Sequence, residues 1–287
     1  GMLSLYHHPF CPFSRCVRIA LGEYGLNAEF VEERIWERRR EFLIVNPAGT
    51  LPVMLDGEGA AICGPRPVLE YLDETRGAEL GDRRLMPDTA RGRAEVRRLL
   101  DWFDIRFHEE VSDYLLTERI YKRFMTPEQG GGAPDSAAIR AARSNIRYHL
   151  HYIGWLAGRR NWLGGDDLSY ADLAAAAHLS CIDYLGEVPW DEFEPAKAWY
   201  ARVKSRPSFR PLLVDQLAGV APSRTYVALD FCSARLARRP QAVGGRTRAL
   251  RRLRRPPRHR PRCGAAGRLP RRRPSAARPS RRPRLDV

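Results

Sequence analysis

The most constraining stretch of this chain runs from residue 46 to residue 72 and centres on a proline directly before an apolar strand. Leu51-Pro52 is followed by the apolar run 53–55. Proline cannot donate a hydrogen bond to a sheet, so it is confined to strand ends and edges. If the Leu51-Pro52 bond is cis, the chain reverses sharply there, and the backbone N–H and C=O of Leu51 face outward. We expect those two groups to be able to pair with an extended peptide.

A backbone clamp of this kind resembles the thioredoxin-like half of the glutathione transferase fold, in which it holds the cysteinyl part of glutathione. In that family a Glu-Ser or Asp-Ser pair opens the next helix and binds the γ-glutamyl end. This chain has Gly64-Pro65 at that place. Glycine has no side chain, and proline has neither a hydroxyl nor an N–H donor. The resemblance therefore implies a degenerate glutathione site at Leu51, Pro52, Gly64 and Pro65. Two contacts of roughly 1.5–3 kcal/mol each are missing, so we expect weak glutathione binding and no other cofactor.

The excess positive charge of the chain is confined to its end. All 287 residues carry a formal net charge of +15, but residues 232–287 alone carry +19, with 20 arginines, no lysine, eight prolines and one acid. Residues 1–231 therefore carry −4. Arginine without lysine, together with Pro, Ala and Gly, is what an out-of-frame reading of GC-rich DNA encodes. We interpret residues 232–287 as a disordered frameshift or read-through product; a polyanion-binding tail and a natural extension are the alternatives.

Cysteine usage and hydropathy indicate a cytoplasmic protein. The six cysteines show neither a Cys-x-x-Cys pair nor metal-ligand spacing, which suits unpaired thiols in a reducing compartment. The adjacent His7 and His8 would point to opposite faces of a strand, so we expect no metal site. No apolar run approaches 18 residues and no signal-peptide pattern is present, so we expect no membrane span.

Residues 2–77 are predicted to form a thioredoxin-like domain. Apolar segments at 3–6, 28–31, 52–55 and 60–63 predict strands. Helices are predicted at 14–24 and 65–75, and a short, weakly helical segment is predicted at 37–45. The order β-α-β-α-β-β-α gives a four-stranded mixed sheet with helices on its faces.

Residues 88–216 are predicted to be all-helical. Apolar residues recur every three or four positions from 96 to 107, and further helices are expected at 139–157, 170–185, 195–206 and up to 216. Ser169-Tyr170-Ala171-Asp172 has the pattern of a capping box. The predicted fold class is α/β plus all-α, a thioredoxin-like N-terminal domain with an all-helical C-terminal domain, as in glutathione transferases.

Cys11 follows the first predicted strand and opens the first helix, where backbone N–H groups and the helix dipole can lower a thiol pKa. Omega-class transferases and glutaredoxins resemble this chain there, with Cys-Pro-Phe or Cys-Pro-Tyr. Ser14 stands in place of a second cysteine. One hypothesis makes Cys11 a monothiol nucleophile, with Ser14 the second catalytic candidate. The alternative, which Gly64-Pro65 favours, is a small residue at a vestigial site.

Trp36 precedes Arg38-Arg39-Arg40 in a charged segment that we expect to be exposed. It is interpreted as an anchor for a protein partner, a lid on the glutathione cleft, or a side chain folded onto its own domain. Arg140 and Arg143 lie at helical spacing with Arg147 and predict a basic stripe. The simplest interpretation of that stripe is an ordinary solvated helix face. The more specific alternative is a surface that binds an acidic protein partner.

The segment 225–231 is aromatic and apolar, which is unusual for a disordered linker. Such a segment docks on its own protein or on another one. We assign residues 217–231 as a partner-binding segment, with Asp230 and Phe231 as the contact candidates.

Several short sequence motifs together indicate a narrower family. They are His7-His8-Pro9, Trp36-Glu37-Arg38-Arg39, the glycine-rich loop 130–136 and Leu229-Asp230-Phe231. In these motifs the chain resembles the FzlA-like division proteins of the glutathione S-transferase superfamily, and the resemblance covers residues 2–231. The resemblance implies a dimeric, non-catalytic adaptor that binds filaments of the tubulin homologue FtsZ and promotes cell constriction and division.

We expect the adaptor to bind a second division partner through residues 225–231. Two other functions are possible for this chain. The first is a glutathione S-transferase or thiol transferase that uses Cys11. The second is nucleic-acid binding through the tail, against which the all-arginine composition argues. We therefore expect no nucleic-acid partner.

We predict that truncation after Phe231 preserves folding and partner binding, because residues 232–287 cannot form a core. The thermal midpoint of the truncated chain, followed by circular dichroism, should match that of the full chain. A midpoint lowered by more than a few degrees would show that the tail packs on the body.

Overall fold

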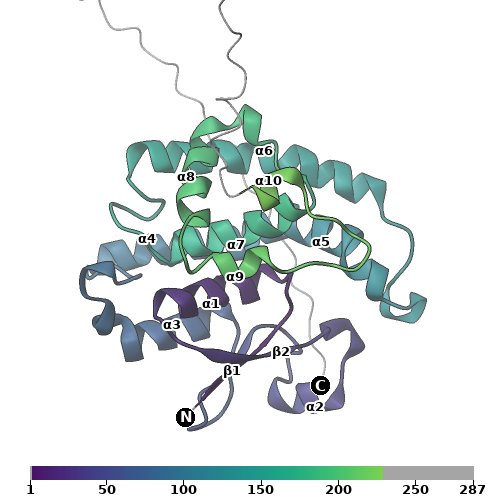
Figure 1. The fold of residues 1–287 in the computed structure, drawn as a ribbon, viewed down its shortest axis with the longest axis horizontal. Coiled ribbons are helices and arrows are strands. Elements are labelled where there is room, and N and C mark those ends of the chain that lie inside the picture. The colour runs from purple at the N-terminus through teal and green to yellow at the C-terminus, as the bar shows by residue number, and fades with distance from the viewer. Residues whose placement is uncertain (1, 229–287) are drawn as a thin grey trace, which may run out of the picture. The chain divides into compact units, whose positions relative to one another are not determined.

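A computed structural model describes residues 2–228 of the chain, and Figure 1 shows their arrangement. The N-terminal half contains the elements β1 (Leu3–His7), α1 (Pro12–Glu23), β2 (Ala28–Glu32), η1 (Ile35–Glu37), α2 (Arg40–Val45), β3 (Val53–Leu55), β4 (Ile62–Cys63) and α3 (Pro65–Arg76). The predicted order of strands and helices is confirmed in this half.

The sheet has the order β2-β1-β3-β4. Strand β1 pairs in parallel with β2, Leu5 opposite Phe30, and antiparallel with β3, Leu5 opposite Met54. Along β1 the side chains of Leu3, Leu5 and His7 are buried, as the two-residue period of a strand requires. Helices α1 and α3 lie between this sheet and the helical half (Figure 1).

The second half is helical, as predicted. It contains η2 (Gly77–Arg83), α4 (Ala90–Asp101), η3 (Trp102–Ser112), α5 (Asp113–Arg119), η4 (Tyr121–Phe124), η5 (Pro127–Gln129), α6 (Ser136–Arg159), α7 (Tyr170–Tyr184), η6 (Trp190–Glu192), α8 (Glu194–Lys204), α9 (Arg210–Leu213) and α10 (Arg224–Val227). Among residues 2–228 no helix is both long and apolar enough to cross a membrane.

One difference from the predicted helices is that η3 is π-helical over eleven residues. Phe103, Phe107 and Val111, at four-residue intervals, are buried along it. π-Helical geometry is rare in proteins and mostly takes the form of single-turn bulges inside α-helices. Apolar periodicity alone predicts a continuous α-helix here and does not reveal the wider turn.

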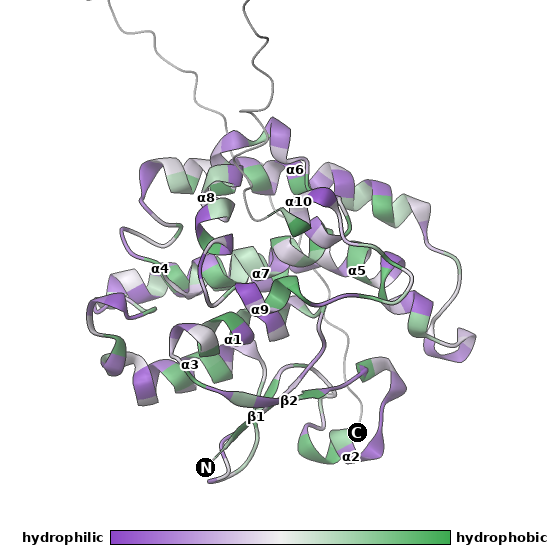
Figure 2. Cartoon of the chain, viewed as in Figure 1, coloured by the Kyte–Doolittle hydropathy of each residue, from purple (hydrophilic) through white to green (hydrophobic). Residues whose placement is uncertain are grey.

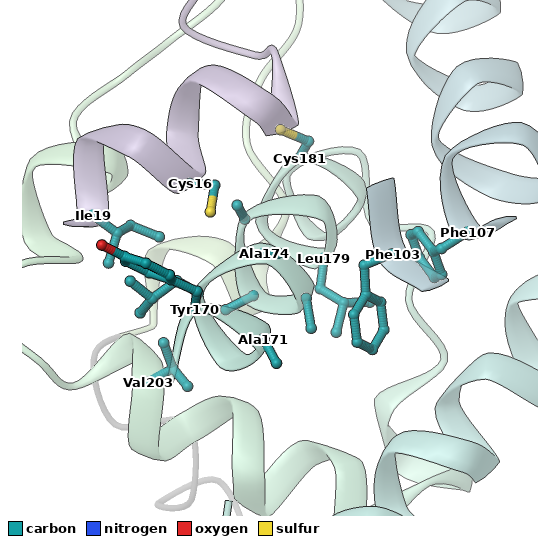
Figure 3. Close-up of a cluster of buried hydrophobic side chains, with 14 of the residues drawn as sticks. Cys16, Ile19, Phe103, Phe107, Tyr170, Ala171, Ala174, Leu179, Cys181 and Val203 are labelled. Atoms are coloured by element: carbon teal, nitrogen blue, oxygen red, sulfur yellow. The ribbon is translucent and has the colours of Figure 1, made fainter. Parts of the chain in front are cut away.

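Helix α7 forms the centre of the core, because all of its residues are buried. Its run of alanines, 174–177, lets α1 approach closely, and Ile19 and Cys16 of α1 face Tyr170 and Ala174 in Figure 3. Figure 2 shows hydrophobic colouring on α1 and α7 and more hydrophilic colouring on the outer helices.

The capping box at the start of α7 is confirmed and extends into the core. The Asp172 carboxylate accepts hydrogen bonds from Ser169 N (3.0 Å), Leu163 N (3.0 Å) and Trp199 Nε1 (2.8 Å). Burial raises the pKa of Asp172 to about 6, although these three N–H donors act to lower it. This one side chain therefore fixes the helix start, the preceding loop and α8 together.

The described part of the C-terminal segment, residues 217–228, docks on its own protein. Tyr226 is fully buried, and its hydroxyl donates to Leu212 O (2.6 Å). Lys204 Nζ donates to the carbonyls of Thr225 (2.5 Å) and Ala228 (3.0 Å). Asp230 and Phe231 lie outside the described residues.

We predict that Asp172→Ala lowers the free energy of unfolding by about 3 kcal/mol or more, because it removes a helix cap and leaves buried N–H donors without an acceptor. Ser169→Ala, which removes only the reciprocal cap, should cost about 1 kcal/mol. Urea denaturation measures both. Equal costs would show that the bonds from Leu163 and Trp199 contribute little.

Candidate functional site

A cavity of about 1100 Å³ opens where the two halves meet. The N-terminal half contributes His8, Cys11, Pro12, Phe13, Glu33, Ile35, Trp36, Glu37, Arg38, Gly49, Thr50, Leu51, Pro65 and Arg66. The helical half contributes Asp101, Asp104, Ile105, His108, Asp113, Thr117, Tyr121, Met125, Glu128 and Gln129. Cys11, Trp36, Leu51 and Pro65, which sequence reasoning placed in several separate candidate sites, therefore share one cleft.

The Leu51-Pro52 bond is cis. Pro52 O accepts a hydrogen bond from Gly64 N (2.9 Å), which ties the clamp to the start of α3. Within residues 2–228, neither the N–H nor the C=O of Leu51 has a hydrogen-bond partner. Both backbone groups of Leu51 are therefore unpaired at the edge of the cavity, as the sequence prediction requires.

The opening of α3 lacks the groups that would bind a γ-glutamyl end. Gly64 caps the helix with φ +96°, a backbone conformation that disfavours any residue with a side chain. Pro65 occupies the first helical position. The next residue, Arg66, lines the cavity but is paired with Asp101. An acidic residue at Gly64 would be strained, so the backbone itself opposes restoring the family's acidic ligand.

Cys11 lies at the cavity as expected, and its thiol is buried. Its side chain caps α1, with Sγ accepting weakly from Ser14 N (3.5 Å). Burial raises the pKa of the Cys11 thiol, and the nearby Asp104 carboxylate adds to the increase, while the Ser14 and Phe13 hydrogen bonds only partly oppose it. The expected lowering of this pKa by the helix start is therefore wrong, because burial outweighs it.

Ser14, the second catalytic candidate, is fully buried and is not part of the cavity lining. Its hydroxyl accepts from His8 N (3.4 Å). Its position in the first turn of α1 points it into the protein, so it supports the loop that carries Cys11 without meeting a ligand in the cleft.

Trp36 is half-buried, which corrects the expectation of an exposed side chain. The turn η1 brings its ring against Tyr121 (5.4 Å between centroids) and His8 (5.6 Å), so it covers part of the cleft. Its Nε1 atom is buried without a hydrogen-bond partner among the described residues. Burial lowers the pKa of His8 to about 4, so this ring is neutral near pH 7.

Sequence reasoning missed a polar chain behind the cavity. Asp104 accepts from His178 Nε2 (3.0 Å), and His178 Nδ1 lies 2.7 Å from Ser112 Oγ. His178 and Ser112 are fully buried, whereas Asp104 reaches the cavity. Helical periodicity places Asp104 and His108 on one face of η3, but nothing in the sequence pairs them with a residue on α7.

The basic stripe on α6 is separate from this cleft. Arg143 pairs with Glu187 (2.7 Å) and Arg147 with Glu192, whereas Arg140 is exposed and has no ion pair within residues 2–228. The stripe is therefore partly neutralised. In the described part of the chain, no three His, Cys, Asp or Glu side chains are grouped so that they could hold a metal ion.

Comparison with known proteins accounts for this architecture. The family described as "Glutathione S-transferase, N-terminal domain" matches residues 5–80, and "Glutathione S-transferase, C-terminal domain" matches residues 134–207. The chain belongs to the glutathione S-transferase family. Within this family, "FtsZ-localized protein A" of Caulobacter vibrioides is 47% identical over 231 residues, which cover 79% of this chain and 98% of that protein.

Solved transferase-family structures agree. "FzlA from C. crescentus" matches with a TM-score of 0.74 and 45% identity, covering 80% of this chain and all of that one. A structure named as a glutathione S-transferase, from Sinorhizobium meliloti, matches with a TM-score of 0.79, 55% identity and the same coverage. The predicted resemblance to FzlA-like members of the transferase family is thus confirmed.

We predict no saturable binding of glutathione at low millimolar concentration, because α3 opens with Gly64-Pro65 and burial raises the pKa of the Cys11 thiol. Isothermal titration calorimetry measures this directly. A micromolar dissociation constant would overturn the prediction and favour an enzyme.

Proposed function

We propose that this protein is a cytoplasmic, non-catalytic adaptor that binds FtsZ filaments and promotes cell constriction and division. The observation that carries the proposal is its 47% identity to FtsZ-localized protein A over nearly the whole of that protein. The geometry of the cleft supports it, because the fold is kept while α3 opens with Gly64-Pro65, which has no side-chain groups for a γ-glutamyl end, and burial raises the pKa of the Cys11 thiol.

A glutathione-dependent transferase is the second candidate. It is favoured by the position of Cys11 at the cavity and by the similarity to a Sinorhizobium meliloti protein named as a transferase. The raised pKa of the Cys11 thiol argues against it, since the thiolate is the reactive form. We therefore rank the adaptor first.

The proposed adaptor is a homodimer. Aromatic and arginine side chains share one outer surface of η3 and α6, which we call the aromatic–arginine stripe: Trp102, Arg106, Tyr148, Tyr152, Trp155 and Arg159. The Arg159 guanidinium lies 4.4 Å from the Trp155 ring, and the Arg106 guanidinium lies 4.9 Å from the Trp102 ring. Trp, Tyr and Arg are the residues that concentrate binding energy at protein interfaces. This composition supports burial of the stripe against a second copy.

Trp155→Glu should therefore shift the protein from dimer to monomer in size-exclusion chromatography with light scattering. Trp155 is 46% exposed, so the substitution should not disturb folding. Val214→Glu, at a side chain that is 77% exposed and outside the stripe, is the matched control and should stay dimeric. A dimeric Trp155→Glu protein would place the interface elsewhere.

Trp36→Glu should weaken FtsZ binding about tenfold or more, because it replaces the half-buried ring at the rim of the cleft with a charge. Cosedimentation with FtsZ polymers measures the effect. Cys11→Ser changes a residue of the same cavity without removing an aromatic contact, so it should pellet normally and complement a depleted strain. If both folded variants bind alike, the assignment of Trp36 to partner contact fails.

Asp230→Lys should separate a second function from FtsZ binding. We propose that residues 229–231 contact a second division partner, so this variant should cosediment normally but fail to restore constriction in a depleted strain. The outer face of α6 is the alternative surface for an acidic partner, and Arg140→Glu with Arg143→Glu tests it in the same assays. Full complementation by Asp230→Lys would remove the proposed second surface.

A further inference from the structure

The charge of the cleft points to a ligand class opposite to glutathione. The cavity lining includes six residues with a carboxylate and only two with a guanidinium. The carboxylates belong to Glu33, Glu37, Asp101, Asp104, Asp113 and Glu128, and the guanidiniums to Arg38 and Arg66. The two lining histidines, His8 and His108, are neutral near pH 7, because burial lowers the pKa of each to about 4. The lining therefore has a formal charge of −4, which repels an anionic peptide and attracts a cationic one.

Not all of these carboxylates are available to a ligand. Glu33 is already paired with Arg39 (2.7 Å), and Asp101 is paired with Arg66. Asp104, Asp113 and Glu128, in contrast, form no ion pair with a lysine or arginine within residues 2–228. All three come from the helical wall of the cleft.

Asp104 is held in a fixed position at that wall. The His178 ring contacts it at 3.0 Å, and Ser112 in turn contacts the other nitrogen of the ring at 2.7 Å. The Asp104 side chain is 14% exposed, while the two supporting residues are fully buried. A carboxylate fixed in this way can bind a cation with little loss of side-chain entropy.

The opposite wall offers hydrogen-bonding groups that suit a peptide backbone. The N–H and C=O of Leu51 have no partner among the described residues, and both can pair with the backbone of an added peptide strand. The Trp36 Nε1–H is buried and also lacks an acceptor there. The backbone of a peptide supplies both N–H donors and C=O acceptors for these groups, whereas a simple amine has no carbonyl acceptor.

We propose that the cleft binds an extended peptide with a basic side chain, its backbone on Leu51 and its ammonium or guanidinium group on the Asp104 and Asp113 wall. The rings of Trp36, Tyr121 and Phe13, all in the lining, provide faces for the hydrocarbon part and the cation. The inference does not depend on FtsZ, because it specifies the chemistry of the occupant and not the protein that carries it.

Calorimetry on the full chain with short capped peptides tests the proposal. Acetyl-Ala-Arg-Ala-amide should bind saturably and at least tenfold more tightly than the same peptide with neutral citrulline or with glutamate in place of arginine. Methylation of the arginine backbone nitrogen, which removes the donor to Leu51 C=O, should also weaken binding at least tenfold. Agmatine, a cation without a peptide backbone, should bind at least tenfold more weakly than the arginine peptide.

Variants locate the site. Asp104→Asn keeps an oxygen for His178 but removes the charge, and it should weaken the arginine peptide at least tenfold. Asp113→Asn, at an exposed side chain, should weaken it as well. Asp191→Asn removes an equivalent charge from a side chain that is 92% exposed and outside the cavity, and it should have no effect.

Three results would overturn the proposal: absence of saturable binding by the arginine peptide, equal binding of the citrulline peptide, or unchanged binding in both Asp104→Asn and Asp113→Asn. Agmatine that binds as tightly as the peptide would overturn the assignment of a peptide ligand. Failure of FtsZ cosedimentation alone would leave the inference intact, so the two proposals fail separately.

Discussion

The arrangement of the two halves depends on the hydrogen bonds of one buried side chain, that of Arg15. Its Nε donates to Pro9 O (2.6 Å), one terminal nitrogen donates to Ser180 Oγ on α7 (2.9 Å), and the other donates to Tyr226 OH (3.1 Å). Burial acts to lower the pKa of Arg15, but Cys181, Tyr226 and Asp215 together raise it, so the charge is retained. One guanidinium therefore joins the thioredoxin-like domain, the helical domain and the C-terminal segment. Loss of a partner would leave a buried charge unpaired, at a cost of about 3–5 kcal/mol.

This junction also fixes the floor of the cleft. The Pro9 carbonyl that Arg15 holds lies two residues before Cys11, and the carbonyl of Phe10 accepts from Tyr121 OH (2.8 Å). Tyr121 in turn packs against Trp36. The cleft is thus maintained by contacts that do not involve glutathione.

Much of this fold could be predicted from local patterns, since strand periodicity, the Ser169–Asp172 cap and the proline at position 52 each have a local physical cause. The cleft could be predicted only in part. The prediction for Trp36 rested on its charged neighbours, but a turn carries its ring inward onto Tyr121, far away in the sequence. The thiol pKa of Cys11 depends on burial and on Asp104, which no local motif reports. The chain Asp104–His178–Ser112 joins two helices and becomes visible only once they pack.

Association of a transferase fold with FtsZ, independent of glutathione, is the central claim of this account. Cosedimentation of the purified full chain with FtsZ polymers tests it most directly, in GTP and in GDP and with low millimolar glutathione added. The account predicts that the protein pellets with polymers in GTP and stays soluble in GDP. Glutathione should not change the amount in the pellet. A protein that remains in the supernatant with assembled FtsZ, or that glutathione releases from the pellet, would contradict it.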